Sequence, residues 1–391
     1  MNSKRILIFF PHNLSEIKTG VHRRFTELVK YFVSRNFSIE LLTLKNYEDF
    51  WPEHLPLKFL PEFENIYFYD HSKGLKHTFI RPLQFYELVL TNYFSGLRSY
   101  KLPDYSFPGL KRLLQNILKS KTYQYVLISY IQWAHLIDQK LPCNPKTIIT
   151  IEDLLSINTS ENKKTSGVRQ NSIEEEIKRI NLFNYALCIS KSEMELIEDR
   201  MEKTKLYYFP VFLAGQTQNK KVIHKYDILF VGSNNKSNQR AFKWFYENVF
   251  PQLRNDLRIL FVGTIVDSIP PKESFKKIRH IDDISEIYSS ASVIINPMTD
   301  GTGMKVKLIE ALAYGKPVIS TSKGVSGLSK AVIEQLIVTD EPSGFADWIH
   351  KLIDDDELYM KFCNISIEIF QTNFSTETAY KVLDNIFMFA D

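Results

Sequence analysis

Long apolar runs are missing from this sequence of 391 residues. The apolar run at residues 6–10 ends at Pro11 and His12, so it is too short for the hydrophobic region of a signal peptide. No run approaches the roughly 18 apolar residues that a membrane-spanning helix needs. We therefore expect neither a targeting segment nor a membrane span, and we interpret residues 6–10 as part of a first buried strand.

Cysteine is scarce, and the three that occur (Cys143, Cys188 and Cys363) are far apart. Their odd number and the lack of a Cys-x-x-Cys pair argue against a disulfide framework, so we expect a reducing, cytoplasmic environment. The nine histidines are scattered without the spacing of metal ligands, and no metal site is predicted. A net charge of +4 is too small to indicate a nucleic-acid partner.

The first part of the chain has the strand and helix pattern of a doubly wound α/β domain. Residues 4–10 are predicted to form a strand, Gly20 opens a helix, and residues 38–44 form the next strand. In such a domain the ligand crevice lies at the carboxyl ends of the strands. The loop at residues 11–19 therefore faces the crevice with His12, although a single loop histidine is more often simply solvated.

Two acidic residues, Glu152 and Asp153, follow directly after a predicted strand at residues 147–151. They are therefore expected at the same carboxyl edge of the sheet. Residues 215–225 lack apolar periodicity and are typical of an interdomain linker. The other elements predicted in this half are strands at 125–129 and 186–190, helices at 135–140 and 174–183, and a polar, mobile loop at 156–172.

The stretch at residues 45–122 is interrupted by six prolines and shows no clear element. Between residues 71 and 121, nine Lys and Arg side chains accompany two acidic ones, which gives a net charge of +7. Two interpretations stay open. The stretch is either a solvated basic face over core aromatics, or a surface that faces anionic lipid or a polyanionic acceptor. A nucleic-acid role is least favoured, because no recognition motif accompanies the charge.

The second half of the chain repeats the alternation of strands and helices. It opens with a strand at residues 227–231 and a polar glycine loop at 232–238. The remaining elements predicted here are helices at 239–250, 284–290, 304–314, 343–355, 356–371 and 375–389, and strands at 258–262, 277–281, 292–295, 317–321 and 333–338.

A glycine loop at residues 300–303 connects the predicted strand 292–295 to the helix 304–314. Such a loop presents backbone N–H groups at a helix N-terminus, where the helix dipole is positive, and this arrangement suits a phosphate. Lys305 and Lys307 stand in the first turn, where the dipole alone would favour carboxylates. Two lysines are reasonable there if a phosphate faces them.

The segment Gly-Thr-Gly-Met-Lys-Val-Lys-Leu-Ile-Glu-Ala-Leu-Ala-Tyr-Gly-Lys-Pro-Val-Ile at 301–319 resembles the donor-binding segment of GT-B-fold glycosyltransferases. Within that fold it is most similar to the retaining family 4 (glycosyl transferases group 1), in a Gly-Thr-Gly subgroup. Weaker matches occur in the correct order, and the resemblance covers most of the chain outside about 50–120. These matches are the Gly20 loop, Ile151–Asp153, Phe230–Ser233 and His280–Asp283.

The resemblance implies an α/β fold with two Rossmann-like doubly wound domains facing a central cleft. Residues 1–212 would form the acceptor-side domain and residues 227–374 the domain that binds the nucleotide sugar, with a linker at 213–226. The last helix, at about 375–391, would pack back onto the first domain.

The resemblance also implies roles for residues of the donor site. Glu310 matches the second of two family glutamates and would bind the donor ribose, whereas Thr302 stands where the first is usual. The N–H groups of Gly303 and Met304 would meet the diphosphate, and Lys305 would stabilise the leaving nucleotide diphosphate. The other positions implied for the donor nucleotide sugar are Gly20, Gly232, Ser233, Asn234, Lys236, His280, Ile281 and Gly301.

On the acceptor side, Glu152 and Asp153 fall where relatives often carry His-Asp, and they join Lys305 and Glu310 as catalytic candidates. His12 and Arg23 are assigned to the acceptor side. Plainer alternatives stay open. Glu310 could pair with Lys307 across i, i+3, Gly20 could be only a helix-entry turn, and the two acidic residues could cap a following helix.

The implied reaction transfers a hexose-type sugar from a UDP- or GDP-type donor to a hydroxyl of a glycan, lipid-linked or protein acceptor. It would proceed with retention and without a metal, in glycan, cell-surface polysaccharide or glycoconjugate synthesis. We expect a cytoplasmic protein with peripheral contact to an anionic membrane and no nucleic-acid partner. Two alternatives stay open: a non-catalytic GT-B relative that stabilises or scaffolds a partner transferase, and a sugar-nucleotide epimerase on the same fold.

Overall fold

The computed structural model describes residues 4–14, 20–45, 61–70, 102–157, 166–213, 215, 225–281, 284–301 and 303–388. Contacts divide the chain into two compact units, Met1–Ile189 with Glu193–Tyr208, and Ser190–Ser192 with Phe209–Asp391. The predicted linker lies mostly outside the described residues. The packing of the last helix onto the first domain stays a prediction. Among the residues that the structure describes, no helix combines the length and the apolar character that spanning a bilayer requires.

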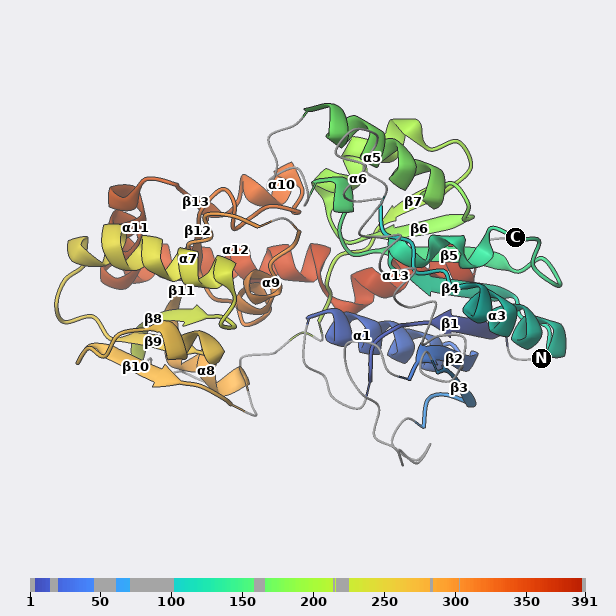
Figure 1. Ribbon diagram of the computed structural model, residues 1–391. Coiled ribbons are helices and arrows are strands. Elements are labelled where there is room, and N and C mark those ends of the chain that lie inside the picture. The colour runs from blue at the N-terminus through green and yellow to red at the C-terminus, as the bar shows by residue number, and fades with distance from the viewer. Residues whose placement is uncertain are drawn as a thin grey trace. The chain divides into compact units, whose positions relative to one another are not determined.

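The first unit contains a seven-stranded parallel sheet in the order β3-β2-β1-β4-β5-β6-β7 (Figure 1). The strand order reverses between β1 and β4, which is where doubly wound sheets bind ligands. The strands are β1 (Arg5–Phe9), β2 (Ser38–Leu44), β3 (Asn65–Tyr69), β4 (Tyr125–Ser129), β5 (Lys146–Ile151), β6 (Tyr185–Cys188) and β7 (Lys205–Tyr208). The helices are α1 (Gly20–Ser34), α3 (Pro108–Ser120), η2 (Ile131–Ile137), α5 (Ser166–Ile180), α6 (Lys191–Ile197) and η3 (Glu198–Arg200).

The apolar sequence of the central strands explains their position in this sheet. All residues of β2 and β4 are buried, as expected for parallel strands that are covered on both faces. Side chains of α3, η2 and α5 join one core cluster with the strands. Four apolar side chains at helical spacing on α1 are also buried: Phe25, Leu28, Val29 and Phe32.

The second unit contains a six-stranded parallel sheet in the order β10-β9-β8-β11-β12-β13 (Figure 1). Its strand order reverses between β8 and β11. The strands are β8 (Tyr226–Val231), β9 (Ile259–Val262), β10 (Phe275–Ile278), β11 (Ala291–Asn296), β12 (Val318–Ser320) and β13 (Ile337–Val338). The helices are α7 (Lys236–Trp244), η4 (Phe245–Val249), η5 (Phe250–Gln252), η6 (Thr264–Ser268), α8 (Ile284–Ser290), α9 (Val306–Ala313), α10 (Lys330–Ile333), α11 (Pro342–Asp354), α12 (Asp356–Asn373) and α13 (Thr376–Phe387).

Two apolar clusters cover the two faces of this second sheet. One contains side chains of α7 and α11, and the other contains side chains of α8, α9 and α12. The predicted α/β class with two doubly wound parallel sheets is therefore confirmed.

Some predicted elements were wrong, and local chemistry explains why. The helix predicted at 135–140 is instead the 3₁₀ helix η2, whose buried Ile131, Ala134 and Ile137 repeat every three residues, the period of that helix type. Of the strand predicted at 333–338, only its end is found, as the two-residue β13, because the short helix α10 extends to Ile333. Ser329 starts α10 by accepting a hydrogen bond from the Val332 N–H.

Two elements occur in the proline-interrupted stretch where none was predicted. Strand β3 pairs with β2 at the edge of the first sheet, and α3 begins at Pro108, where the missing N–H of proline costs nothing. Residues 46–60 and 71–101 of that stretch lie outside the described residues.

A buried carboxylate interrupts the apolar strand β2. Glu40 is 0% exposed, yet it accepts hydrogen bonds from Tyr67 Oη at 2.9 Å and Asn65 Nδ2 at 3.1 Å. Lys121 and the hydroxyl of Tyr123 also donate to it. Burial opposes the charge, but the hydrogen bonds from Lys121, Tyr123, Asn65 and Tyr67 together hold the pKa of Glu40 below its ordinary value.

Candidate functional site

The glycine loop of the second unit leaves the start of α9 open to a ligand. Gly301 and Gly303 adopt φ angles of 93° and 75°, in a region that favours glycine. The N-cap residue Lys305 provides no side-chain cap to the helix. The helix α7, by contrast, is capped by Asn235, whose Oδ1 accepts from the Asn238 N–H at 2.8 Å. The first N–H groups of α9 are therefore suited to an external anion.

Lys305 is held by the same loop. Its Nζ donates to the carbonyl oxygens of Gly303 at 2.9 Å and Gly301 at 3.4 Å. The loop thus wraps around a cation directly beside the open helix start. Thr302, the position where a family glutamate is missing, lies outside the described residues.

A second turn packs onto this loop from the segment after β12. Gly327 has φ of 90°, and a Cβ added there would lie 3.1 Å from the Met304 nitrogen. Ser326 Oγ also donates to the Gly303 carbonyl at 3.3 Å. A side chain at position 327 would therefore crowd the backbone of Met304, one of the predicted phosphate contacts.

Glu310 lies on α9 and is only 6% exposed. Its Oε2 accepts a hydrogen bond from Tyr288 Oη at 2.9 Å, and the Tyr288 ring stacks on Tyr314. The described side chains do not form the alternative pair of Glu310 with Lys307. The Lys307 ammonium instead donates to Asn238 Oδ1 at 3.0 Å.

The predicted loop after β8 lies beside the glycine loop, because β8 and β11 are neighbours at the point where the strand order reverses. Within it, Gly232 and Ser233 come before Asn234, whose Oδ1 accepts from Ser268 Oγ and Gln239 Nε2, both at 2.7 Å. Lys236 is exposed at the first residue of α7. His280 and Ile281 lie past the end of β10, and Ile281 packs against the same apolar cluster as Met304.

Arg240 is a residue that the sequence reasoning passed over. Its guanidinium pairs with Asp300 at the edge of the glycine loop, and so connects α7 to that loop. Burial opposes the charge of Asp300, but the hydrogen bond from Arg240 holds the pKa of that carboxyl below its usual range. The signal in the sequence was its position, because Arg240 is the first arginine after the strand predicted at 227–231.

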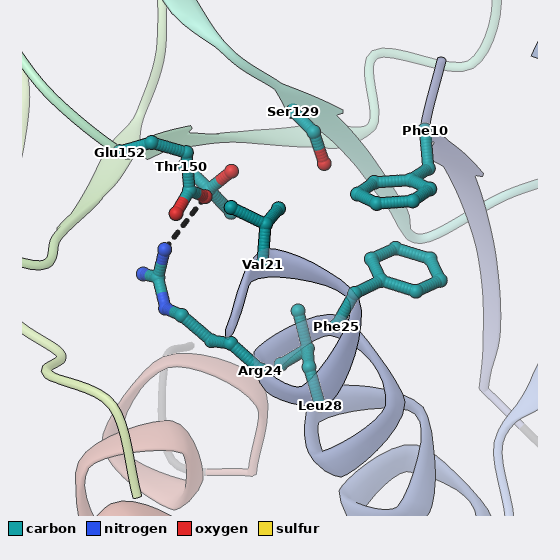
Figure 2. A pocket seen from close by; sticks show the side chains of 8 residues that line it. All are labelled: Phe10, Val21, Arg24, Phe25, Leu28, Ser129, Thr150 and Glu152. Carbon is teal, nitrogen blue, oxygen red and sulfur yellow. Dashed lines mark hydrogen bonds and ion pairs between the residues drawn. The ribbon is translucent and has the colours of Figure 1, made fainter. Parts of the chain in front are cut away.

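In the first unit, a small pocket lies where β4 and β5 end beside the start of α1 (Figure 2). Arg24 Nη1 donates to Glu152 Oε1 at 2.6 Å across it, and these side chains are 4% and 12% exposed. The buried Glu152 Oε2 and Thr150 Oγ1 have no hydrogen-bond partner among the described residues. The pocket is lined by Phe10, Val21, Arg24, Phe25, Leu28, Ser129, Thr150 and Glu152.

The partner of Glu152 is Arg24, which was not among the predicted site residues. Arg24 lies four residues before the buried Leu28, so both are on the core-facing side of α1. The side chain of Arg23 lies outside the described part of the chain. Gly20 is the first residue of α1, as predicted.

His12 belongs to an aromatic cluster at the end of β1. Its ring centroid lies 5.3 Å from Tyr130, 5.4 Å from Phe10 and 5.8 Å from His22. Tyr130 has φ of 69°, a strained conformation for a non-glycine residue that is typical of functional sites. His12 is therefore part of a packed group and not simply a solvated loop histidine.

Two carboxylates hold the backbone just after Glu152 and Asp153 through hydrogen bonds. Glu193 accepts from the Leu154 N–H at 3.0 Å, and Glu176 accepts from the Leu155 N–H at 2.6 Å. Burial raises the pKa of Glu176 above its ordinary value. Because these carboxylates lock the turn after β5, Glu152 keeps one position at the sheet edge.

We expect the Arg24–Glu152 pair to be coupled in its effect on stability. The substitution Arg24→Met leaves a largely buried carboxylate without its charged hydrogen-bond donor, so it should lower the free energy of unfolding by about 2 kcal/mol. The double variant Arg24→Met with Glu152→Gln should lose clearly less than the sum of the single losses. Urea denaturation of the four proteins measures this, and strictly additive losses would contradict the coupling.

Within the described ranges, no group of three or more His, Cys, Asp or Glu side chains could hold a metal ion.

Part of this sequence is similar to known proteins. Residues 225–355 match the family described as glycosyl transferases group 1. An uncharacterised 44.6 kDa protein in the cps region of Klebsiella pneumoniae is 26% identical over 188 residues, which cover 43% of this chain and 46% of that protein. The match thus spans about half the length of this curated relative.

Solved structures show the same fold across the whole chain. Sucrose-phosphate synthase from Thermosynechococcus elongatus matches with a TM-score of 0.69 and 14% identity, covering 98% of both chains. Anabaena Alr3699/HepE, solved in complex with UDP and glucose, matches with a TM-score of 0.67 and 12% identity, covering 99% of this chain and 100% of that one. At these identities the likeness establishes the fold alone, which is the predicted GT-B architecture.

Proposed function

We propose that this chain, which has the GT-B fold and carries a glycosyl transferases group 1 domain, is a glycosyltransferase that uses a nucleotide-diphosphate sugar. The observation that carries the proposal is the start of α9. Its N–H groups without a side-chain cap, the glycine loop and the enclosed Lys305 would form an anion site at the point where the strand order reverses. This site lies inside the segment that matches the family.

The donor would be held by the second unit. Gly303 and Met304 would donate backbone N–H groups to the diphosphate, Lys305 would stabilise the charge on the leaving group, and Glu310 would accept from the ribose hydroxyls. The complex of the similarly folded Anabaena protein with UDP and glucose supports a diphosphate nucleotide of this kind. Further donor contacts are proposed for Gly20, Gly232, Ser233, Asn234, Lys236, His280, Ile281, Gly301 and Thr302.

The acceptor hydroxyl would approach the first unit. Glu152 and Asp153 stand at the end of β5, and His12 lies at the end of β1 beside the strained Tyr130. We propose transfer with retention and without a required metal, in the synthesis of a cell-surface polysaccharide or glycoconjugate. The position of the Klebsiella pneumoniae relative in a cps region fits that pathway. Determining the anomeric configuration of the product tests retention.

Peripheral contact with an anionic membrane also remains a proposal. Most of the basic stretch lies outside the described residues. Within the described part, Lys111 pairs with Asp138 at 2.6 Å and Lys121 pairs with Glu40, which leaves Arg112 and Lys119 as the exposed cations of α3. Failure to bind vesicles of anionic phospholipid at low salt would remove this proposal.

Thermal unfolding with added nucleotides tests donor binding. A ligand that binds only the folded protein at 100 times its Kd stabilises it by about 2.7 kcal/mol. We expect UDP or GDP and the matching sugar nucleotide to raise the Tm of the wild type, and we expect the rise to shrink for Lys305→Met at the same concentration. The variant Lys243→Met changes an exposed lysine on the same unit and serves as a control.

The rise in Tm, together with an assay of released nucleotide diphosphate, separates the enzyme from a scaffold and from an epimerase. A scaffold that has lost donor binding shows no rise in Tm with any nucleotide. A glycosyltransferase shows the rise and also releases free nucleotide diphosphate when acceptor is present. An epimerase shows the rise but releases no nucleotide diphosphate.

A further inference from the structure

Lys307 is a second lysine of the glycine-loop helix, and its surroundings are unusual for a cation. Its Nζ donates to Asn238 Oδ1 at 3.0 Å and to Met298 Sδ at 3.4 Å, and it lies 4.9 Å from the centroid of the Phe230 ring. An amide oxygen, a thioether and an aromatic face are weak partners for an ammonium group. None of its partners among the described residues is a carboxylate.

These contacts place Lys307 between the two loops that follow β8 and β11. Phe230 belongs to β8, Asn238 to the first turn of α7, and Met298 to the chain just after β11. Asn238 in turn donates to the Ser233 carbonyl at 2.9 Å, so the ammonium is tied to the Gly232–Ser233 loop. The strand order reverses between β8 and β11, and this is where a doubly wound sheet presents its ligand crevice.

We propose that Lys307 is a further cation of the donor diphosphate site, which acts with Lys305 so that the loop meets the diphosphate with two lysines. This inference rests on the proposed function, because it assumes that the diphosphate binds at the start of α9. The i, i+3 spacing favoured a structural pair between Lys307 and Glu310, and this inference assigns Lys307 a role in binding instead.

The charged groups around Lys307 leave its ammonium without a neutralising counter-ion among the described residues, which a bound anion would provide. Lys305, on the same helix start, repels it. Arg240 on α7 and Asp300 on the loop pair with each other, and Lys236 is exposed at the α7 start. Phe230 of β8 and Met298, just after β11, carry no charge.

The protonation of Lys307 should therefore change when a diphosphate binds. Burial and the repulsion by Lys305 lower the pKa of Lys307 to about 7. A bound diphosphate favours the ammonium form and raises that pKa. At about pH 8, where the free lysine is mostly neutral, binding should take up about one proton.

Isothermal titration calorimetry with UDP and GDP at about pH 8, repeated in HEPES and in Tris, measures this proton uptake from the difference in heat. For the wild type we expect uptake of about one proton. For Lys307→Met, whose side chain fits beside Phe230 and Met298, we expect the uptake to vanish and the affinity to fall about tenfold or more. For Lys305→Met we expect weaker binding with most of the uptake retained, because Lys307 keeps its contacts with Asn238, Met298 and Phe230.

The outcomes separate this inference from the proposed function. If the wild type binds UDP or GDP but Lys307→Met keeps the same affinity and proton uptake, the inference is overturned and the proposed function stands. If the wild type binds neither nucleotide, the proposed function fails and the inference fails with it. A thermal melt of Lys307→Met and a second variant, Lys307→Gln, show that any loss of binding is not a loss of folding.

Discussion

The substitution Glu310→Ala is expected to weaken binding of the nucleotide donor about a hundredfold, which corresponds to about 3 kcal/mol. Glu310 is nearly fully buried on α9, and in the proposed complex its carboxylate would accept hydrogen bonds from the ribose. A hydrogen bond to a charged group contributes roughly 1.5–3 kcal/mol, and the ribose hydroxyls would be left unpaired in the variant. Calorimetric titration of the variant with UDP and GDP measures the loss.

The neighbouring tyrosine provides a matched control for that experiment. Tyr288→Phe removes the hydroxyl that donates to Glu310 but keeps the ring, which stacks on Tyr314 with centroids 4.9 Å apart. Because only one neutral donor is lost, we expect an effect of about 1 kcal/mol, or about fivefold. Donor affinity close to wild type in Glu310→Ala would remove Glu310 from the site, and an equal loss in both variants would indicate a structural role.

The glycine loop was predictable because its determinants are local. The strand before it, the glycines, the helix after it and Lys305 all lie within a short segment, and local periodicity is what sequence patterns report best. The predicted helix 304–314 is found as α9, which begins two residues later and ends one residue earlier. Helix ends of this kind vary by one or two residues between definitions.

The partners of the site residues were not predictable, because they come from distant parts of the chain. Arg24 and Glu152 are separated by 128 residues, and Lys307 and Asn238 by 69. The spacing of Lys307 and Glu310 favoured a local i, i+3 pair, but the tertiary fold offers Lys307 an amide and an aromatic face from neighbouring elements. Sequence spacing can propose such pairs but cannot rank them against contacts made by folding.

Strand β3 was also not predictable from the local sequence. Its residues are only partly buried or exposed, so it lacks the apolar pattern by which the central strands were recognised. It forms because the edge of β2 offers it backbone hydrogen bonds in register. Edge strands of this kind depend on a neighbour that the local sequence does not reveal.

The substitution Glu40→Ala is expected to lower the free energy of unfolding by roughly 3–5 kcal/mol. This carboxylate is fully buried in β2, and removing it leaves the Tyr123 hydroxyl without its acceptor and Lys121 without its counter-ion. Such a loss is a large part of the 5–15 kcal/mol that stabilises a typical protein. Urea denaturation at about pH 7 measures the difference from wild type.

The contribution of Glu40 to the free energy of unfolding should also decrease as the pH falls. Because folding lowers the pKa of Glu40, its stabilising effect is fully present above the ordinary value of 4.5 and is lost as the pH falls through the lower folded value. The difference between wild type and Glu40→Gln should therefore shrink on acidification below that range. A difference that is the same at neutral and acidic pH would show that the charge of Glu40 does not stabilise the fold.

The exposed pair of Glu27 and Lys30 on α1 is the matched control for the buried one. Their charged atoms lie 2.6 Å apart, but the Lys30 side chain is 58% exposed, and a solvated pair contributes roughly 0.2–1 kcal/mol. Glu27→Gln should therefore change stability by less than about 1 kcal/mol. If Glu27→Gln and Glu40→Gln lose equally, burial and the tyrosine hydrogen bonds add nothing, and the account of Glu40 as a structural anchor of the first sheet is wrong.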